Sequence, residues 1–165
     1  MFNLLQNILP VFLLLAPASA LALTAGEAAP NFDLPARSDG SISLSKLSGN
    51  VVYVDLWASW CGSCRKSFPL MTQLQEKYGS QGLKIVAVNI DKKRENAEKF
   101  LAELSPNFSI AFDPDGSVPK SYSMKTMPSS YVIDRSGKIE RVIEGFHGES
   151  AQEIESAIQA ALAQK

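Results

Sequence analysis

Two cysteines, Cys61 and Cys64, are the residues whose type and spacing most directly predict chemistry in this chain of 165 residues. Only Gly62 and Ser63 separate them, and they lie between a β-branched and aromatic run, residues 51–57, and a pattern with helical spacing. A cysteine at a helix N-terminus meets unpaired N–H groups and the positive end of the helix dipole, which favour a thiolate. Because the thiolate is the attacking form in disulfide exchange, we interpret Cys61 as a nucleophile and Cys64 as the resolving thiol.

Two structural uses of this cysteine pair compete with redox chemistry. A structural disulfide would close a very short loop, which removes little entropy from the unfolded chain. Half of a zinc site would need further ligands, but there is no second CxxC and the single histidine, His147, lies far along the sequence. Redox chemistry is therefore favoured, with no cofactor and no resident metal. A non-enzymatic chaperone that holds a soft ion such as Cu(I) between the two thiols stays open as an alternative.

The start of the chain predicts export. Residues 1–26 contain no charged side chain, residues 8–16 form an apolar run too short to span a bilayer comfortably, and small-x-small sites follow at residues 18–22. We predict that residues 1–22 are a signal peptide, with an N-terminal membrane anchor as the alternative, and that the protein is exported to the periplasm. The net charge of -1 gives no reason to expect nucleic-acid binding.

Hydrophobic periodicity predicts an α/β chain with one domain over residues 27–165. The runs at residues 51–57 and 83–90 are apolar at most positions, with Asp55 the exception in the first, which is typical of strands covered on both faces. Shorter strands are expected at 108–112, 131–133 and 139–143, helices at 68–78, 97–104 and 150–162, and a small hairpin before them all. Ser150 and Glu153 suggest a capping box for the last helix. This order predicts a central mixed sheet flanked by helices on both faces.

Residues 51–64, VVYVDLWASWCGSC, resemble the active-site region of the thioredoxin family, which commonly has tryptophans at the positions of Trp57 and Trp60. Pro69 matches a helix-kinking proline of that family, and Met127-Pro128 resembles its cis-proline loop. The opening hairpin and the insert at residues 94–105 resemble the exported TlpA/ResA-like branch. The resemblance implies a thioredoxin-like fold with an added N-terminal β-hairpin, and thiol–disulfide oxidoreductase activity.

The same resemblance implies further roles for residues around the cysteines. Pro128 would be cis and would face the CxxC, where flanking backbone groups bind an extended substrate by strand addition. Trp60 and Met127 would line that groove. Asp55 stands six residues before Cys61, where thioredoxin itself has an acid, so it would help to take the proton from Cys64. The charges of residues 91–95 are expected to be a solvated helix start.

The resemblance, together with Asp55, favours reduction of disulfides over their formation or isomerisation, although the Gly-Ser dipeptide between the cysteines does not decide the direction. The expected partners are exported proteins with disulfides, apocytochrome c among them, and a membrane thiol protein that donates electrons.

Overall fold

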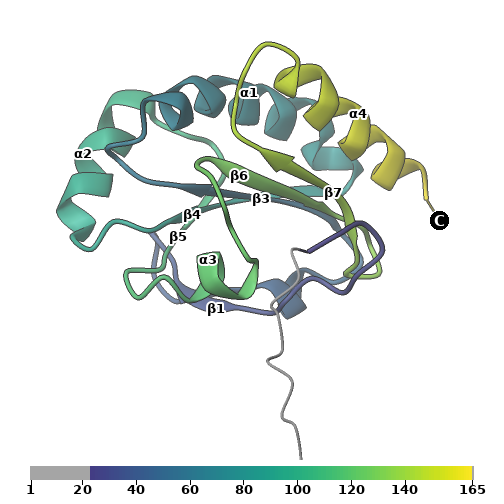
Figure 1. Cartoon of the computed structure of the whole chain (residues 1–165), viewed down its shortest axis with the longest axis horizontal. Helices are drawn as coiled ribbons and strands as arrows, with labels where there is room; N and C mark the ends of the chain where they lie inside the picture. Colours follow the sequence, from purple (N-terminus) through teal and green to yellow (C-terminus); the bar gives the residue numbers. More distant parts are fainter. Residues whose placement is uncertain (1–22, 165) are drawn as a thin grey trace, which may run out of the picture.

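The computed structural model describes residues 23–164 and contains a central five-stranded mixed sheet (Figure 1). Its strand order is β5-β4-β3-β6-β7. The strands are β3 (Val51–Trp57), β4 (Leu83–Asn89), β5 (Ser109–Phe112), β6 (Ser129–Ile133) and β7 (Ile139–Glu144). Strands β3, β4 and β5 run parallel, whereas β6 is antiparallel to both β3 and β7. The predicted mixed sheet is thus confirmed.

Helices cover both faces of the sheet. The longer helices are α1 (Gly62–Tyr78), α2 (Arg94–Leu104) and α4 (Ser150–Ala163), and their apolar residues share one core cluster with Tyr53 and Trp57 of β3. The other face of β3, with Val54 and Leu56, packs against α3 (Ser117–Ser121) and the segment around a small hairpin. The hairpin, β1 (Asp33–Pro35) and β2 (Ser41–Ser43), is followed by η1 (Leu44–Leu47), and Figure 1 places β1 and α3 beneath the sheet.

Strand β3 is buried at every position, as its apolar pattern predicted, and Asp55 is buried with the rest. The last residues of the three parallel strands lie side by side. Trp57 at the end of β3 lies opposite Asn89 of β4, and Asn89 in turn lies opposite Phe112 of β5. The carboxyl ends of the three parallel strands therefore meet at one edge of the sheet. The loops that follow them, including the loop that leads to the cysteines, lie at this edge.

Two local features differ from the sequence analysis. The short helix α3 was not predicted; the buried Asp113 caps it by accepting hydrogen bonds from the N–H groups of Ser117 and Val118. The prediction that Ser150 and Glu153 form a capping box is wrong, because Glu149 occupies the N-cap position of α4. The Ser150 hydroxyl is buried and accepts a hydrogen bond from the His147 N–H at 3.0 Å, so the preceding loop already uses it.

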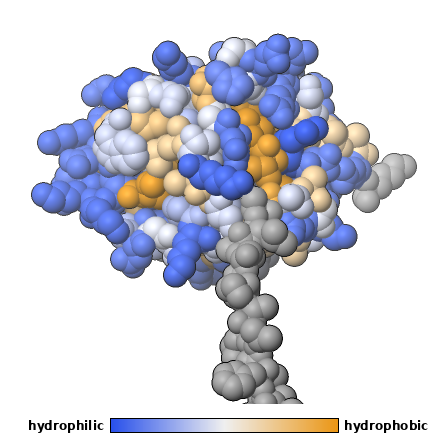
Figure 2. All heavy atoms as spheres, in the orientation of Figure 1, coloured by the Kyte–Doolittle hydropathy of each residue, from blue (hydrophilic) through white to orange (hydrophobic). Residues whose placement is uncertain are grey.

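The surface of the molecule is largely hydrophilic on the face drawn in Figure 2, with apolar patches between the charged side chains. Within residues 23–164, no helix has both the length and the hydropathy needed to cross a bilayer. The predicted signal segment, residues 1–22, lies outside the described residues. One short additional turn, η2 (Gly79–Gln81), links α1 to β4.

Candidate active site

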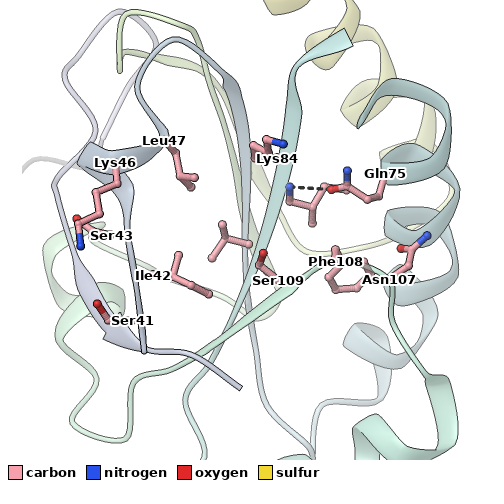
Figure 3. Close-up of a pocket in the computed structure, with 12 residues that line it drawn as sticks. Ser41, Ile42, Ser43, Lys46, Leu47, Gln75, Lys84, Asn107, Phe108 and Ser109 are labelled. Atoms are coloured by element: carbon pink, nitrogen blue, oxygen red, sulfur yellow. Dashed lines mark hydrogen bonds between the residues drawn. The ribbon is translucent and has the colours of Figure 1, made fainter. Parts of the chain in front are cut away.

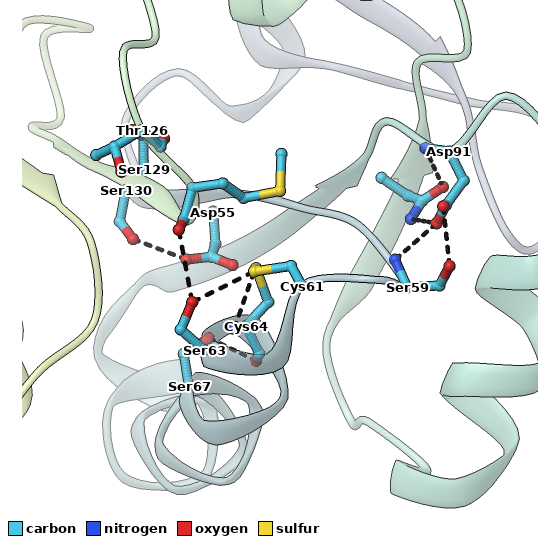
Figure 4. Close-up of a disulfide and its surroundings, with 12 residues drawn as sticks. Asp55, Ser59, Cys61, Ser63, Cys64, Ser67, Asp91, Thr126, Ser129 and Ser130 are labelled. Carbon is cyan, nitrogen blue, oxygen red and sulfur yellow. Dashed lines mark hydrogen bonds between the residues drawn. A yellow bond between two sulfur atoms is a disulfide. The ribbon is translucent and has the colours of Figure 1, made fainter.

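Cys61 and Cys64 form a disulfide at the N-terminus of α1 (Figure 4). Cys61 is the N-cap residue of the helix, and its Sγ accepts a hydrogen bond from the Cys64 N–H at 3.1 Å. Cys61 is 6% exposed to solvent, whereas Cys64 is fully buried. A partner can therefore reach Cys61 first. In the reduced protein, the same N–H group and the helix dipole would stabilise a thiolate on Cys61.

The two tryptophans before the cysteines have different environments. Trp60 is 70% exposed and is the only large hydrophobic side chain of the described part of the chain with such exposure. Trp57 is fully buried, with ring centroids 5.0 Å from Phe68 and 4.8 Å from Phe100. The buried aromatic group forms a rigid base under the loop, from which Trp60 projects into solvent.

The loop before β6 faces the cysteines, and its Met127–Pro128 peptide bond is cis, the conformation that the resemblance implied. Ser63, between the two cysteines, links the loop to the helix: its Oγ lies 3.5 Å from the Met127 carbonyl oxygen and 3.4 Å from Cys61 Sγ. The half-buried Met127 also packs against the core cluster that contains both cysteines. The structure thus brings together Cys61, Cys64, Met127 and Pro128.

Asp55 is completely buried on the face of β3 that carries Tyr53 and Trp57, the face covered by α1. Figure 4 shows its carboxyl group between Ser130 and the cysteine pair. Ser130 Oγ donates a hydrogen bond to Asp55 Oδ1 at 2.7 Å, and the Tyr53 hydroxyl lies 3.5 Å from the same oxygen. The other oxygen, Oδ2, is buried and has no hydrogen-bond partner among the described residues.

Burial controls the acidity of this carboxyl group. Desolvation raises the pKa of Asp55 from 3.8 to about 7, and the opposing hydrogen bonds from Ser130 and Tyr53 offset only part of the effect. At neutral pH, Asp55 can therefore be either protonated or ionised. A group with this pKa can both accept and return a proton, which is the property a general base needs near physiological pH.

Two contacts at the site were missed in the sequence analysis. Asp91 was expected among solvated charges, but it is buried and accepts hydrogen bonds from Ser59 in the loop before Cys61, because the register of β4 brings the two segments together. Ser130 was not singled out at all, although it lies directly opposite Asp55 in the pairing of β3 with β6. The partner of each residue follows from the strand register, which the sequence does not show.

A separate pocket of about 330 Å³ lies between β2, η1, β4 and the start of β5, and none of its lining residues belongs to the cysteine site (Figure 3). There, Gln75 of α1 accepts a hydrogen bond from the Ile85 N–H at 3.1 Å and donates one to the Leu83 carbonyl at 3.4 Å. The side-chain amide thus occupies the edge of β4 that β5 does not reach. Among residues 23–164, no cluster of three potential metal ligands occurs.

A cysteine pair at the start of α1, opposite a cis-proline loop and next to a central sheet of this topology, defines the class of thioredoxin-like thiol–disulfide oxidoreductases. Comparison with known proteins identifies the family: the chain belongs to the Redoxin family, whose model matches residues 24–160. Thiol-disulfide oxidoreductase ResA from Bacillus subtilis (strain 168) is 33% identical over 129 residues, which cover 78% of this chain and 72% of ResA.

Solved structures show the same relationship. The crystal structure of a Chlorobium tepidum protein assigned as thiol:disulfide interchange protein DsbE has a TM-score of 0.83 and 47% identity, covering 86% of this chain and 100% of that one. StoA from Bacillus subtilis, at 24% identity and a TM-score of 0.66, covers 78% of this chain and 96% of its own and shares the fold. The predicted thioredoxin-like fold and thiol–disulfide oxidoreductase activity are confirmed.

Proposed function

We propose that this protein reduces disulfides in exported proteins, with Cys61 as the nucleophile, Cys64 as the resolving thiol and Asp55 as the base. The observation that carries the proposal is the unequal placement of the two sulfurs. Cys61 lies at the helix N-terminus next to the exposed Trp60 and the cis-proline loop, whereas Cys64 is buried on the same side of β3 as Asp55. This difference supports an attacking role for Cys61 and a resolving role for Cys64.

The reaction starts from the reduced pair. The Cys61 thiolate attacks one sulfur of a substrate disulfide, whose S–S bond breaks, and the departing substrate thiolate takes up a proton. A mixed disulfide now joins Cys61 to the substrate. Asp55 accepts the proton of Cys64, and the resulting thiolate attacks Cys61 Sγ and expels the second substrate thiolate. Two electrons have then passed to the substrate, and the protein holds the Cys61–Cys64 disulfide seen in the structure.

The cis-proline loop supports the assignment of a polypeptide substrate. We infer that backbone groups beside Pro128 pair with an extended segment of the substrate, while Trp60 and Met127 contact its side chains. Backbone pairing accepts many sequences, which suits a reductase with several exported partners, such as an apocytochrome c. A membrane dithiol protein would return two electrons to the pair. Residues 1–22 would direct the domain at 27–165 to the periplasm, or anchor it there.

Trapping of the mixed disulfide tests these assignments. In Cys64→Ser, Cys61 can attack but nothing can resolve the intermediate, so a peptide disulfide should become covalently attached to the protein, as detected by mass spectrometry. Cys61→Ser is the matched control, and it should give no adduct at neutral pH. The unmodified protein, supplied with excess dithiothreitol, should reduce the same peptide catalytically. An adduct that forms equally through Cys64 would contradict the assigned roles.

A further inference from the structure

We propose that Asp91 is a positioning residue for the redox reaction: its buried carboxylate holds the loop of residues 58–61, and thereby sets where Cys61 and Trp60 meet a substrate. Asp91 lies two residues beyond the end of β4 and is 6% exposed. Its Oδ2 accepts a hydrogen bond from the Ser59 N–H at 2.8 Å, and its Oδ1 accepts one from Ser59 Oγ at 2.9 Å. This inference rests on the proposed role of Cys61 as the nucleophile.

The carboxylate is itself held firmly. Asn89, fully buried at the end of β4, donates a hydrogen bond from Nδ2 to Asp91 Oδ2 at 2.7 Å and accepts one from the Asp91 N–H at 3.1 Å. Figure 4 shows the two hydrogen bonds from Ser59 to Asp91, on the side of the cysteine pair next to Cys61. The Asn89–Asp91 unit is thus a fixed extension of β4, and the loop is attached to a rigid element.

Only a few hydrogen bonds fix the path from β3 to the nucleophile. The Trp57 carbonyl accepts a hydrogen bond from the Ile90 N–H at 3.0 Å, and the Ala58 carbonyl accepts one from the Cys61 N–H at 3.1 Å. Between these two backbone bonds, the hydrogen bonds that Ser59 donates to the Asp91 carboxylate tie the loop to the end of β4. Since Trp60 projects into solvent, its own burial cannot hold the loop. Displacement of a reacting group by about 1 Å can cost about 10²-fold in rate.

For this positioning role, the side chain at residue 91 needs the shape and the hydrogen-bonding groups of Asp91, but not its charge. Asp91→Ala removes three accepted hydrogen bonds and frees the loop. In Asp91→Asn, the amide oxygen can still accept from the Ser59 N–H and from Asn89, while the amide nitrogen donates to Ser59 Oγ, because a hydroxyl is both donor and acceptor. The positioning role therefore predicts that Asn restores what Ala removes.

The chain offers a matched control in Asp113. This carboxylate is also buried just beyond the end of a parallel strand, and it also accepts three hydrogen bonds, from Ser117 N, Ser117 Oγ and Val118 N at 3.1, 2.9 and 2.8 Å. Asp113 holds the first turn of α3, whereas Asp91 holds the loop before Cys61. Asp113→Ala should therefore destabilise the fold about as much as Asp91→Ala without moving the nucleophile.

The experiment measures kcat/KM for reduction of a peptide disulfide and the second-order rate of iodoacetamide with reduced Cys61, well below the melting temperature of each variant. We expect kcat/KM to fall about ten-fold or more in Asp91→Ala, to stay within about two-fold of the parent in Asp113→Ala, and to recover to within about three-fold in Asp91→Asn. Ser59→Ala keeps the backbone bond and should lose roughly three-fold; it also serves as the test if Asp91→Ala does not fold.

Several results would overturn the positioning role. An equal loss in Asp113→Ala would show that stability alone is involved, and a loss in Asp91→Asn as large as in Asp91→Ala would show that the charge is required. Full activity of both Asp91→Ala and Ser59→Ala would show that the loop needs no such contact. A parent protein that reduces no peptide disulfide, although its Cys61 reacts with iodoacetamide, would instead refute the proposed function and this inference with it.

Discussion

Replacement of Asp55 by asparagine should stabilise the oxidised protein at high pH and leave it unchanged at low pH. Burial raises the pKa of Asp55 from 3.8 to about 7, so between these values the folded protein keeps a proton that the unfolded chain has released. The contribution of this proton to the free energy of unfolding is fully present below pH 3.8 and is lost as the pH rises to about 7. Since one pKa unit corresponds to about 1.4 kcal/mol, the loss is roughly 4 kcal/mol.

Denaturant unfolding of the oxidised protein from pH 4 to 8.5 measures this effect, and the Cys61–Cys64 disulfide removes thiol titration from the comparison. The free energy of unfolding of Asp55→Asn should exceed that of the parent increasingly with pH, and the difference should level off above pH 7. Asp115→Asn, at an exposed carboxyl, controls for the change in net charge and should follow the parent. A difference for Asp55→Asn that is constant with pH would show that folding does not raise the pKa of Asp55.

Three further predictions concern the surroundings of the site. Asp134→Asn should destabilise the protein by up to about 1 kcal/mol at neutral pH, because hydrogen bonds to the carboxylate outweigh its desolvation and lower its pKa. The difference should disappear as the pH falls through that lowered pKa, which unfolding curves at neutral and acid pH check. Phe100→Ala should cost about 3–5 kcal/mol in denaturant unfolding, since it leaves a cavity beside Trp57. Gln75→Ala should uncover the edge of β4 at Ile85 and increase self-association, measurable by sedimentation velocity, whereas an unchanged monomer would exclude that edge role.

The local pattern of the sequence was enough to predict the five strands of the sheet and the three longer helices, although it missed the short helix α3. The apolar run of β3 is buried on both faces, and the helix after Cys61 begins at Gly62, because binary patterning and backbone chemistry act over short ranges. The resemblance of residues 51–64 and 127–128 to the thioredoxin family then implied which loop faces the cysteines. The cis peptide bond before Pro128 agrees with that implication.

Contacts between strands were not predictable in the same way. Ser130 meets Asp55, and Asp91 meets Ser59, only because three strands pair in one particular register. A single sequence contains no signal for that register, so Asp91 resembled a charge at an exposed helix start. Its position just beyond the end of a buried strand, at the edge where the active-site loop emerges, is the one feature that could have marked it as buried.

The equilibrium redox potential of the Cys61–Cys64 pair tests the proposed reductase most directly. The protein would be equilibrated with glutathione or dithiothreitol buffers, and the oxidised fraction measured by acid quenching and alkylation. A reductase should have a potential at or below about -220 mV, at which the dithiol is an effective electron donor. A value near about -120 mV would contradict this role and would assign the protein to disulfide formation or isomerisation.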